Sequence, residues 1–123
     1  MESKPLFFVG SSHEDLRALP EDVKAVFGYA LYLAQLGEIH VRAKPLRGFG
    51  SAGVLEIVDH DEGGTYRTVY TVRLAGAVYV LHVFQKKSRR GIATPRQEIA
   101  LVRARLRQAE QHHAAFGRRV EDQ

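Results

Sequence analysis

The sequence lacks cysteine and tryptophan and has one methionine and four prolines in 123 residues. Without cysteine the chain can build neither a disulfide framework nor a thiolate metal site, and this composition fits a reducing compartment. No apolar run approaches the roughly eighteen residues that span a membrane, and residues 1–12 lack the basic and then apolar order of a signal peptide. We therefore expect a cytoplasmic protein without membrane segments.

Several familiar catalytic motifs are also missing. The chain has no glycine-rich phosphate loop followed by Lys-Ser/Thr, no Gly-x-Ser-x-Gly and no His-Glu-x-x-His. The adjacent His112 and His113 cannot both face one metal ion from a helix. We expect neither a metal nor a cofactor.

The residues that are present describe an ordinary folded domain. Hydrophobic residues make up 45% of the chain and charged residues 26%, which is typical of a globular protein and not of a disordered one. This length suits one compact domain with a modest core. We assign residues 1–117 to that domain and residues 118–123 to a short charged tail.

Positive charge is concentrated in the C-terminal part. From Lys86 to Arg119 the chain has ten Lys or Arg and two acids, whereas residues 1–85 have eight basic and ten acidic residues. Such asymmetry favours phosphate-rich or acidic partners. The alternative is a solvated helix face without a binding role.

The N-terminal third predicts one strand and a helical hairpin. A short β-rich run over 4–9 precedes Ser11 and Glu14, whose capping-box spacing starts a first helix. Pro20 starts a second helix, which ends at Gly37 and carries apolar residues at helical spacing. This apolar stripe needs a sheet to cover it.

Three strand candidates follow the glycine-rich, basic loop of residues 41–53. They cover 54–61, 65–74 and 77–85, and turn signals separate them, so consecutive antiparallel hairpins are expected. The last of them is apolar on both faces, as in a central strand.

A final helix is predicted from Thr94 and Pro95 to about Ala115, with one apolar and one arginine-rich face. The order β-α-α-β-β-β-α predicts an α+β fold. We expect a small antiparallel sheet with an N-terminal helical hairpin and a C-terminal helix, and with the helices packed on one face.

Cations on these strands are the main candidates for function. Arg67 interrupts a strand of apolar and hydroxylated residues, and a cation in mid-strand needs a physical reason. A guanidinium can hold a phosphate through two hydrogen bonds, but an ion pair with Glu56 on the neighbouring strand is the alternative. Lys86 and Lys87 end the last strand, where alternation sends only one of them to the Arg67 side.

The sequence allows a structural and a functional interpretation of His82 and of three tyrosines. His82 is either a semi-buried, hydrogen-bonded residue or a donor to a phosphate, and it is the reserve acid–base candidate. Tyr66, Tyr70 and Tyr79 are core residues or cross-strand partners, unless one faces the basic surface and stacks on RNA bases. Tyr70 is our candidate for such stacking.

Four strings together resemble the phage-derived, Gp49-like branch of the RelE/HigB toxin superfamily. They are KPLRGFGSAGVLEI (44–57), Tyr66-Arg67 in mid-strand, LHVFQKKS (81–88) and TPRQEIALVRARL (94–106). The family pattern has Leu-Glu-Ile after a glycine-containing loop, then an arginine-containing strand, Leu-x-x-Phe-x-Lys-Lys-Ser/Thr and Thr-Pro-x-x-Glu-Ile-x-x-Ala. Val102 and Arg103 stand near the place of its last alanine, which is a small departure.

The resemblance implies a RelE-like fold and a toxin of a type II toxin–antitoxin pair. Such a toxin cleaves mRNA without a metal, usually on the translating ribosome, and its usual partner is an antitoxin with a helix-turn-helix domain. The 2′-hydroxyl of a ribose would attack the adjacent phosphorus. The site must then take the 2′ proton and stabilise the charge that grows on the phosphorane.

These demands suggest roles for the catalytic candidates. Arg67 would stabilise the phosphorane. Lys87, with Lys86 beside it, would hold the scissile phosphate or act as base or acid, and the family pattern favours Lys87. Some members of the superfamily use a C-terminal tyrosine, but this chain has none after Tyr79. His82, a lysine or ribosomal RNA would then supply the missing proton transfer.

The remaining candidates would bind RNA. Lys44 and Arg47 would position its backbone, Tyr70 would stack on a base, and Arg89 and Arg90 would guide RNA or the ribosome. The rival interpretation is a basic module that binds RNA or a protein without cutting anything, because the chain has no histidine–glutamate pair at a recognisable spacing.

Overall fold

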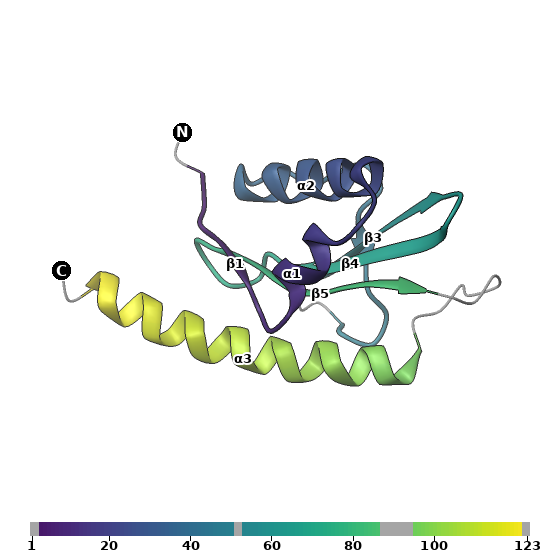
Figure 1. The fold of residues 1–123 in the computed structure, drawn as a ribbon. Coiled ribbons are helices and arrows are strands. Elements are labelled where there is room, and N and C mark those ends of the chain that lie inside the picture. Colours follow the sequence, from purple (N-terminus) through teal and green to yellow (C-terminus); the bar gives the residue numbers. More distant parts are fainter. Residues whose placement is uncertain (1–2, 51–52, 87–94, 122–123) are drawn as a thin grey trace.

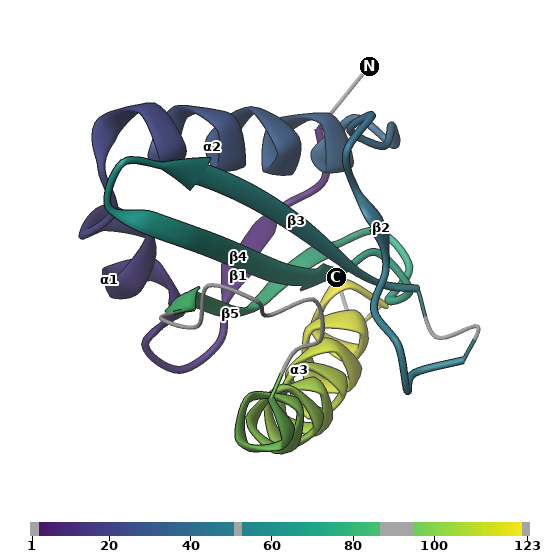
Figure 2. The ribbon, with the colours of Figure 1, turned by 90° about the vertical axis from the view of Figure 1, so that its right-hand side faces the viewer.

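A computed structural model describes residues 3–50, 53–86 and 95–121 of the chain, with side chains up to Phe116. A five-stranded sheet lies between α2 on one face and the long α3 on the other (Figure 1; Figure 2). The elements in chain order are β1 (Leu6–Phe8), α1 (Ser12–Arg17), α2 (Glu21–Gln35), β2 (Lys44–Pro45), β3 (Val54–Asp61), β4 (Gly64–Thr71), β5 (Val78–Lys86) and α3 (Arg96–Glu121).

The predicted α+β class and order are confirmed, with the two-residue β2 as an addition. Two details of the prediction are wrong. The strand order is β1-β5-β4-β3-β2, and β1 pairs with β5 in parallel, so only β2 to β5 are antiparallel. The helices also cover both faces, because the central strands carry apolar side chains on both sides and each side needs a cover.

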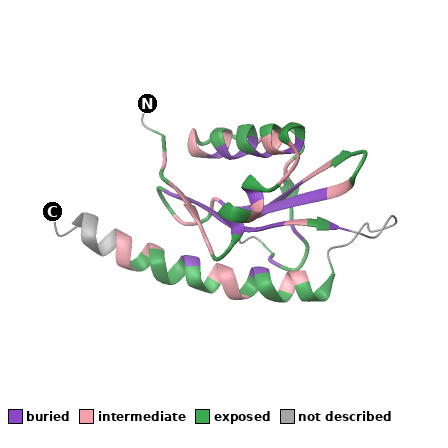
Figure 3. Ribbon diagram, in the orientation of Figure 1, coloured by how far each residue is buried: buried purple, intermediate pink, exposed green. Residues whose placement is uncertain are grey.

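Each face of the sheet has its own core (Figure 3). Beneath α2, Val23, Phe27 and Ala30 pack against Ile57 and Val80 from the strands. Beneath α3, the predicted apolar stripe of that helix packs against the other side of β4 and β5. Its members are Ile99, Val102, Leu106 and Ala109. Two thin layers of apolar contact therefore hold the helices to one shared sheet.

The helix ends differ from the sequence prediction. Ser11 precedes α1, but its hydroxyl donates to the carboxylate of Asp15 at 2.8 Å and forms no cap with the backbone, so the expected capping box with Glu14 is absent. Pro20 precedes α2 and is not its first residue. The last helix begins at Arg96 and continues past the predicted end near Ala115.

A bulge in β5 changes which residues face α3. Val69 of β4 lies opposite His82, but the next residue, Tyr70, lies opposite Val80, so Leu81 is an extra residue in β5. Leu81 packs in the core beneath α3, and His82 also points to α3. A regular strand would send one of them to the opposite face. The bulge therefore brings His82 to the α3 face.

Within the described residues, no helix has both the length and the apolar character needed to cross a bilayer.

Candidate active site

A row of charged side chains crosses the sheet on the α3 face. Lys44 of β2 lies directly opposite Glu56 of β3, and Arg67 of β4 lies diagonally across from Glu56. Lys86 ends β5 two residues beyond Phe84, which is the partner of Arg67. Opposite residues, and residues two apart in a strand, share a face. The four charged side chains therefore point to the same side of the sheet.

Arg67 and Glu56 form a buried ion pair in the middle of this row. The Arg67 Nη1 donates to Glu56 Oε2 at 2.9 Å, and the two residues are only 3% and 6% exposed. The structure thus confirms the ion pair that was the alternative reading of Arg67. Two charges in a low-dielectric site need such a contact to offset their desolvation.

Lys86 lies on the Arg67 side of the sheet and is 8% exposed. Burial lowers the pKa of Lys86, the positive charge of Arg67 lowers it further, and the carboxylate of Glu56 opposes both effects. An amine with a lowered pKa gives up its proton more readily, which is useful in acid–base chemistry. Lys87, which the family pattern favours, lies outside the described residues, as do Arg89 and Arg90.

His82 is held between two residues of α3. Its Nε2 contacts Glu98 Oε2, and its Nδ1 lies 3.4 Å from Nη1 of Arg105. The imidazole also stacks on Phe84, with ring centroids 4.6 Å apart and planes 18° apart. His82 is 7% exposed, so it is semi-buried and hydrogen-bonded, as the first of its two readings expected.

Arg105 is itself fixed at the bulge. Its Nη1 donates to the carbonyl oxygen of Leu81 at 3.0 Å, and its Nη2 donates to the hydroxyl of Ser11 at 3.2 Å. A Cβ at Gly10, which has φ +59°, would lie 2.8 Å from the guanidinium carbon. Glycine at this position therefore permits both the backbone turn and the close approach of Arg105.

The burial of Tyr70 argues against its expected stacking role. Tyr70 is fully buried in the core beneath α2, on the face opposite Arg67. Tyr66 and Tyr79 are also buried, so the core reading applies to all three. Lys44 and Arg47, in contrast, are exposed near the edge strand β2, where both are accessible to a polyanion.

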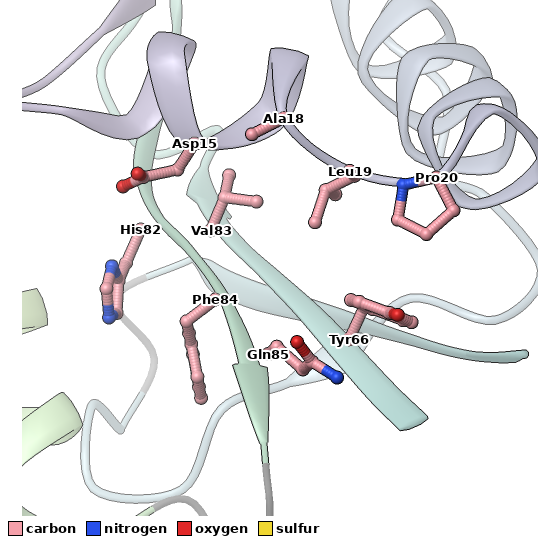
Figure 4. Close-up of a pocket in the computed structure, with 9 residues that line it drawn as sticks. All are labelled: Asp15, Ala18, Leu19, Pro20, Tyr66, His82, Val83, Phe84 and Gln85. Atoms are coloured by element: carbon pink, nitrogen blue, oxygen red, sulfur yellow. The ribbon is translucent and has the colours of Figure 1, made fainter. Parts of the chain in front are cut away.

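An open pocket of about 550 Å³ lies beside His82, along the outer edge of β5. β1 pairs with residues 78–80 of β5, and among the residues that the structure describes no strand pairs with the rest of that edge. Figure 4 shows His82 and Asp15 at one end of the pocket and Tyr66 and Gln85 at the other. The pocket therefore offers polar groups at both ends, next to a titratable ring.

Glu98 and Arg105 are functional candidates that the sequence reasoning did not select. One signal was available for Glu98, since it is one of only two acids between Lys86 and Arg119. An isolated acid in a basic segment is a candidate for a specific contact with a basic side chain. Arg105 carried no comparable signal among the other arginines of its helix.

The two adjacent histidines near the end of α3 contact different groups. Nδ1 of His112 lies 2.7 Å from the hydroxyl of Tyr79, and Nε2 of His113 lies 2.8 Å from the carbonyl oxygen of Ala75. In the part of the chain that the structure describes, no three His, Asp or Glu side chains gather in a metal-binding cluster. His112 therefore contacts β5, and His113 contacts the connection between β4 and β5.

Comparison with known proteins identifies a family and a similar fold. The family model "Phage derived protein Gp49-like (DUF891)" matches residues 14–107, which is more than half of the chain. No curated protein matches the chain at a significant level.

Two solved structures are similar in fold. A double mutant of the E. coli toxin RelE in the free state has a TM-score of 0.52 and 22% identity, over 69% of this chain and 85% of that chain. The toxin–antitoxin complex RelBE2 from Mycobacterium tuberculosis has a TM-score of 0.45 and 24% identity, over 72% of this chain and 97% of that chain. The fold is therefore similar to that of the E. coli toxin RelE, and the chain belongs to the family of phage-derived Gp49-like proteins.

Proposed function

We propose that this protein is the toxin of a type II toxin–antitoxin pair and that it cleaves mRNA, without a metal, on the translating ribosome. The observation that carries the proposal is the row of Lys44, Glu56, Arg67 and Lys86 on one sheet face, with His82 on the same face. Phosphoryl transfer from RNA needs cations around the phosphate and groups that exchange protons with two oxygens. This row contains both.

The reaction begins with attack of a ribose 2′ oxygen on the adjacent phosphorus. That bond forms while the bond from phosphorus to the 5′ oxygen breaks, which leaves a 2′,3′-cyclic phosphate and a 5′-hydroxyl. His82 and Lys86 lie on opposite sides of Phe84, the residue across from Arg67. An in-line displacement needs its base and its acid on opposite sides of phosphorus, so we assign the base to His82 and the acid to Lys86.

The lowered pKa of Lys86 supports its role as the acid that protonates the 5′ oxygen. Arg67 would stabilise the phosphorane from between the two proton-transfer groups, with Glu56 holding its guanidinium in a fixed orientation. Because Arg67 is almost fully buried, the side chains that cover this row must move before RNA can reach it.

The RNA backbone would approach across exposed cations at the edge of the sheet. Lys44 and Arg47 are exposed there, and backbone contacts of this type position a nucleic acid without reading its sequence. Contacts from Lys87, Arg89 and Arg90 remain part of the proposal.

We assign an antitoxin with a helix-turn-helix domain as the partner. Similar solved structures support an antitoxin as the partner, because one is described as a toxin and another as a toxin–antitoxin complex. The helix-turn-helix domain is what the family resemblance implies. Co-purification with the product of an adjacent helix-turn-helix gene, and relief of growth arrest by that product, test the assignment.

The central experiment compares Lys86→Met with the wild type. The long thioether side chain keeps the buried volume and removes the ammonium group, so cleavage should fall about 100-fold while the fold persists. RNA 5′ ends are mapped after induction, and in purified reactions with and without translating ribosomes. Lys24→Met is the control, because Lys24 lies on α2 and pairs with Glu21 away from the row. Wild-type cleavage by Lys86→Met would remove Lys86 from the mechanism.

Arg67 needs a paired design, because Arg67→Ala would leave the buried Glu56 carboxylate without the guanidinium that donates to it. Such a loss costs about 3–5 kcal/mol and confuses stability with activity. Replacing both Glu56 and Arg67 by Met removes the charges together, and we expect this double variant to fold and to lose cleavage. If it cleaves like the wild type, the pair has only a structural role.

A non-catalytic RNA-binding or protein-binding module is the second candidate function. The burial of Arg67 in an ion pair favours it, because a guanidinium occupied by a carboxylate is not open to phosphate. Growth arrest without new RNA 5′ ends would support this candidate. Cleavage that persists in the presence of a chelator would support the metal-independent nuclease.

A further inference from the structure

The side chains around His82 join two segments that are distant in the sequence. Glu98 and Arg105 lie two turns apart on α3, and the imidazole of His82 lies between them. His82 and Glu98 form a histidine–glutamate pair when α3 packs on the sheet. Their spacing in the sequence is not a recognisable motif.

The hydrogen bonds select one tautomer of His82. Arg105 carries only donors, so the Nδ1 that faces it must be an acceptor without a proton. The proton of the neutral ring is then on Nε2, where the carboxylate of Glu98 accepts it. Stacking on Phe84 fixes the plane of the ring.

The two contacts of the ring differ in strength. Arg105 donates at 3.0 Å to the carbonyl oxygen of Leu81 and is only 3.4 Å from Nδ1 of His82, so its main partner is the carbonyl oxygen. A substrate hydroxyl can therefore take the place of Arg105 at Nδ1 without breaking the bond that fixes the guanidinium.

We propose that Glu98 is the positioning residue of His82: it holds the proton on Nε2 and leaves Nδ1 as the nitrogen that accepts the 2′-hydroxyl proton. This inference rests on the proposed function. The 2′ oxygen bonds to phosphorus, its proton moves to Nδ1, and the phosphorus to 5′ oxygen bond breaks as Lys86 donates a proton. The imidazolium then carries its positive charge next to the Glu98 carboxylate, which stabilises it.

Other charged groups near the ring do not offer the same contact. Asp15 of α1 lines the same pocket, but its Oδ2 accepts from Ser11. On the sheet, Arg67 and Lys86 share the face of His82 and are positively charged. Glu98 is thus the acid that contacts the ring.

The test compares Glu98→Gln with the wild type on translating ribosomes. The amide keeps the size of the side chain and removes its charge, so we expect kcat for cleavage to fall about 100-fold with KM changed less than about twofold. Glu98→Asp, which keeps the charge, should recover part of the rate. Glu110→Gln is the matched control, because Glu110 is exposed on the same helix.

A second control separates positioning from simple loss of helix packing. Arg103 also attaches α3, since it donates to the carbonyl oxygen of Gly48 at 2.8 Å and lies over the ring of Phe49. Arg103→Gln should leave kcat within about twofold of the wild type if the chemistry depends on the His82–Glu98 pair and not on α3 attachment in general.

Nitrogen-15 NMR of the imidazole gives a readout that does not depend on cleavage. The wild type should show His82 protonated on Nε2 and not on Nδ1, and Glu98→Gln should lose this single tautomer while Glu110→Gln keeps it. Wild-type kcat in Glu98→Gln, or a proton on Nδ1 in the wild type, would overturn the inference and leave the proposed function standing. Absence of cleavage by the wild type would overturn both.

Discussion

Beneath α2 the sheet buries Phe27, Ile57 and Tyr70 and, among the described residues, no charged side chain, whereas beneath α3 it buries Glu56 and Arg67 as an ion pair. The two faces share the same strands, so strand propensity does not explain the difference. On β3 and β4, the buried residues on the α2 side are uncharged, whereas Glu56 and Arg67 are buried and charged on the α3 side. The α2 face is therefore mainly structural, and the α3 face carries the candidate site.

The energetics of the two faces support this division. A buried apolar contact stabilises a fold directly, but a buried ion pair contributes little net stability, and a matched pair of hydrophobic residues often replaces it without loss. Stability alone would favour apolar residues in place of the Glu56–Arg67 pair within the core beneath α3. The charges on that face therefore point to a function that requires them.

The largest expected effect comes from breaking the α2 face. Phe27 is fully buried, and Phe27→Ala should lower the free energy of unfolding by about 3–5 kcal/mol, a large part of the total for a small domain. Urea denaturation followed by circular dichroism measures this change. Growth inhibition should disappear together with the fold. Lys86→Met, in contrast, should lose cleavage and keep the fold.

Tyr29 on the same helix provides the control, because it is 55% exposed. Tyr29→Ala should change the free energy of unfolding by less than about 0.5 kcal/mol. Equal destabilisation by both variants would contradict the assignment of the α2 face as the main core.

A smaller effect of opposite sign is expected at Tyr70. Its hydroxyl is buried and has no hydrogen-bond partner among the described residues, so Tyr70→Phe should raise the free energy of unfolding by about 1 kcal/mol. Cleavage should not change, because this ring belongs to the α2 face. If a stable Tyr70→Phe variant lost activity, Tyr70 would have a role in RNA binding despite its burial.

The same variant has a signature at alkaline pH. Burial raises the pKa of Tyr70 to about 12, so between about pH 10 and pH 12 the unfolded phenol loses its proton while the folded one keeps it. The unfolded state is then favoured as pH rises. Tyr70→Phe should lose less stability than the wild type over this range in the same denaturation experiment.

Much of the fold could be predicted from local patterns in the sequence. The predicted strand over 54–61 has the bounds of β3, and the apolar stripes of α2 and α3 pack as their helical spacing indicated. These features depend on the periodicity of neighbouring residues. The parallel pairing of β1 with β5 depends on contacts across more than seventy positions, and no local pattern encodes it.

The sequence predicts those contacts of the candidate site that depend only on the spacing between neighbouring strands. The pairing of Arg67 with Glu56 follows from the register of two consecutive strands, so it was a natural alternative. The His82–Glu98 contact needs the bulge at Leu81 and the packing position of α3 as well. The extra residue in β5 has no glycine or other turn signal, and regular alternation would place His82 on the face opposite Leu81.

The smallest expected effect is the pH dependence that Lys86 adds to stability. Burial, together with Arg67, lowers the pKa of Lys86 from 10.5, so the folded protein releases this proton at a lower pH than the unfolded chain does. Between the two pKa values the unfolded state binds more protons, and the free energy of unfolding therefore rises with pH. The charged amine costs stability below that window.

Lys86→Met removes this titration and provides the reference. The free energy of unfolding of the wild type minus that of Lys86→Met should increase as pH rises toward 10.5, the ordinary value of a lysine. Urea denaturation of both proteins at matched pH values measures the difference, in which other titrating groups cancel. A difference that stays constant or decreases would mean that the amine of Lys86 is as well solvated as an ordinary surface lysine, and the α3 face would then lose its candidate acid.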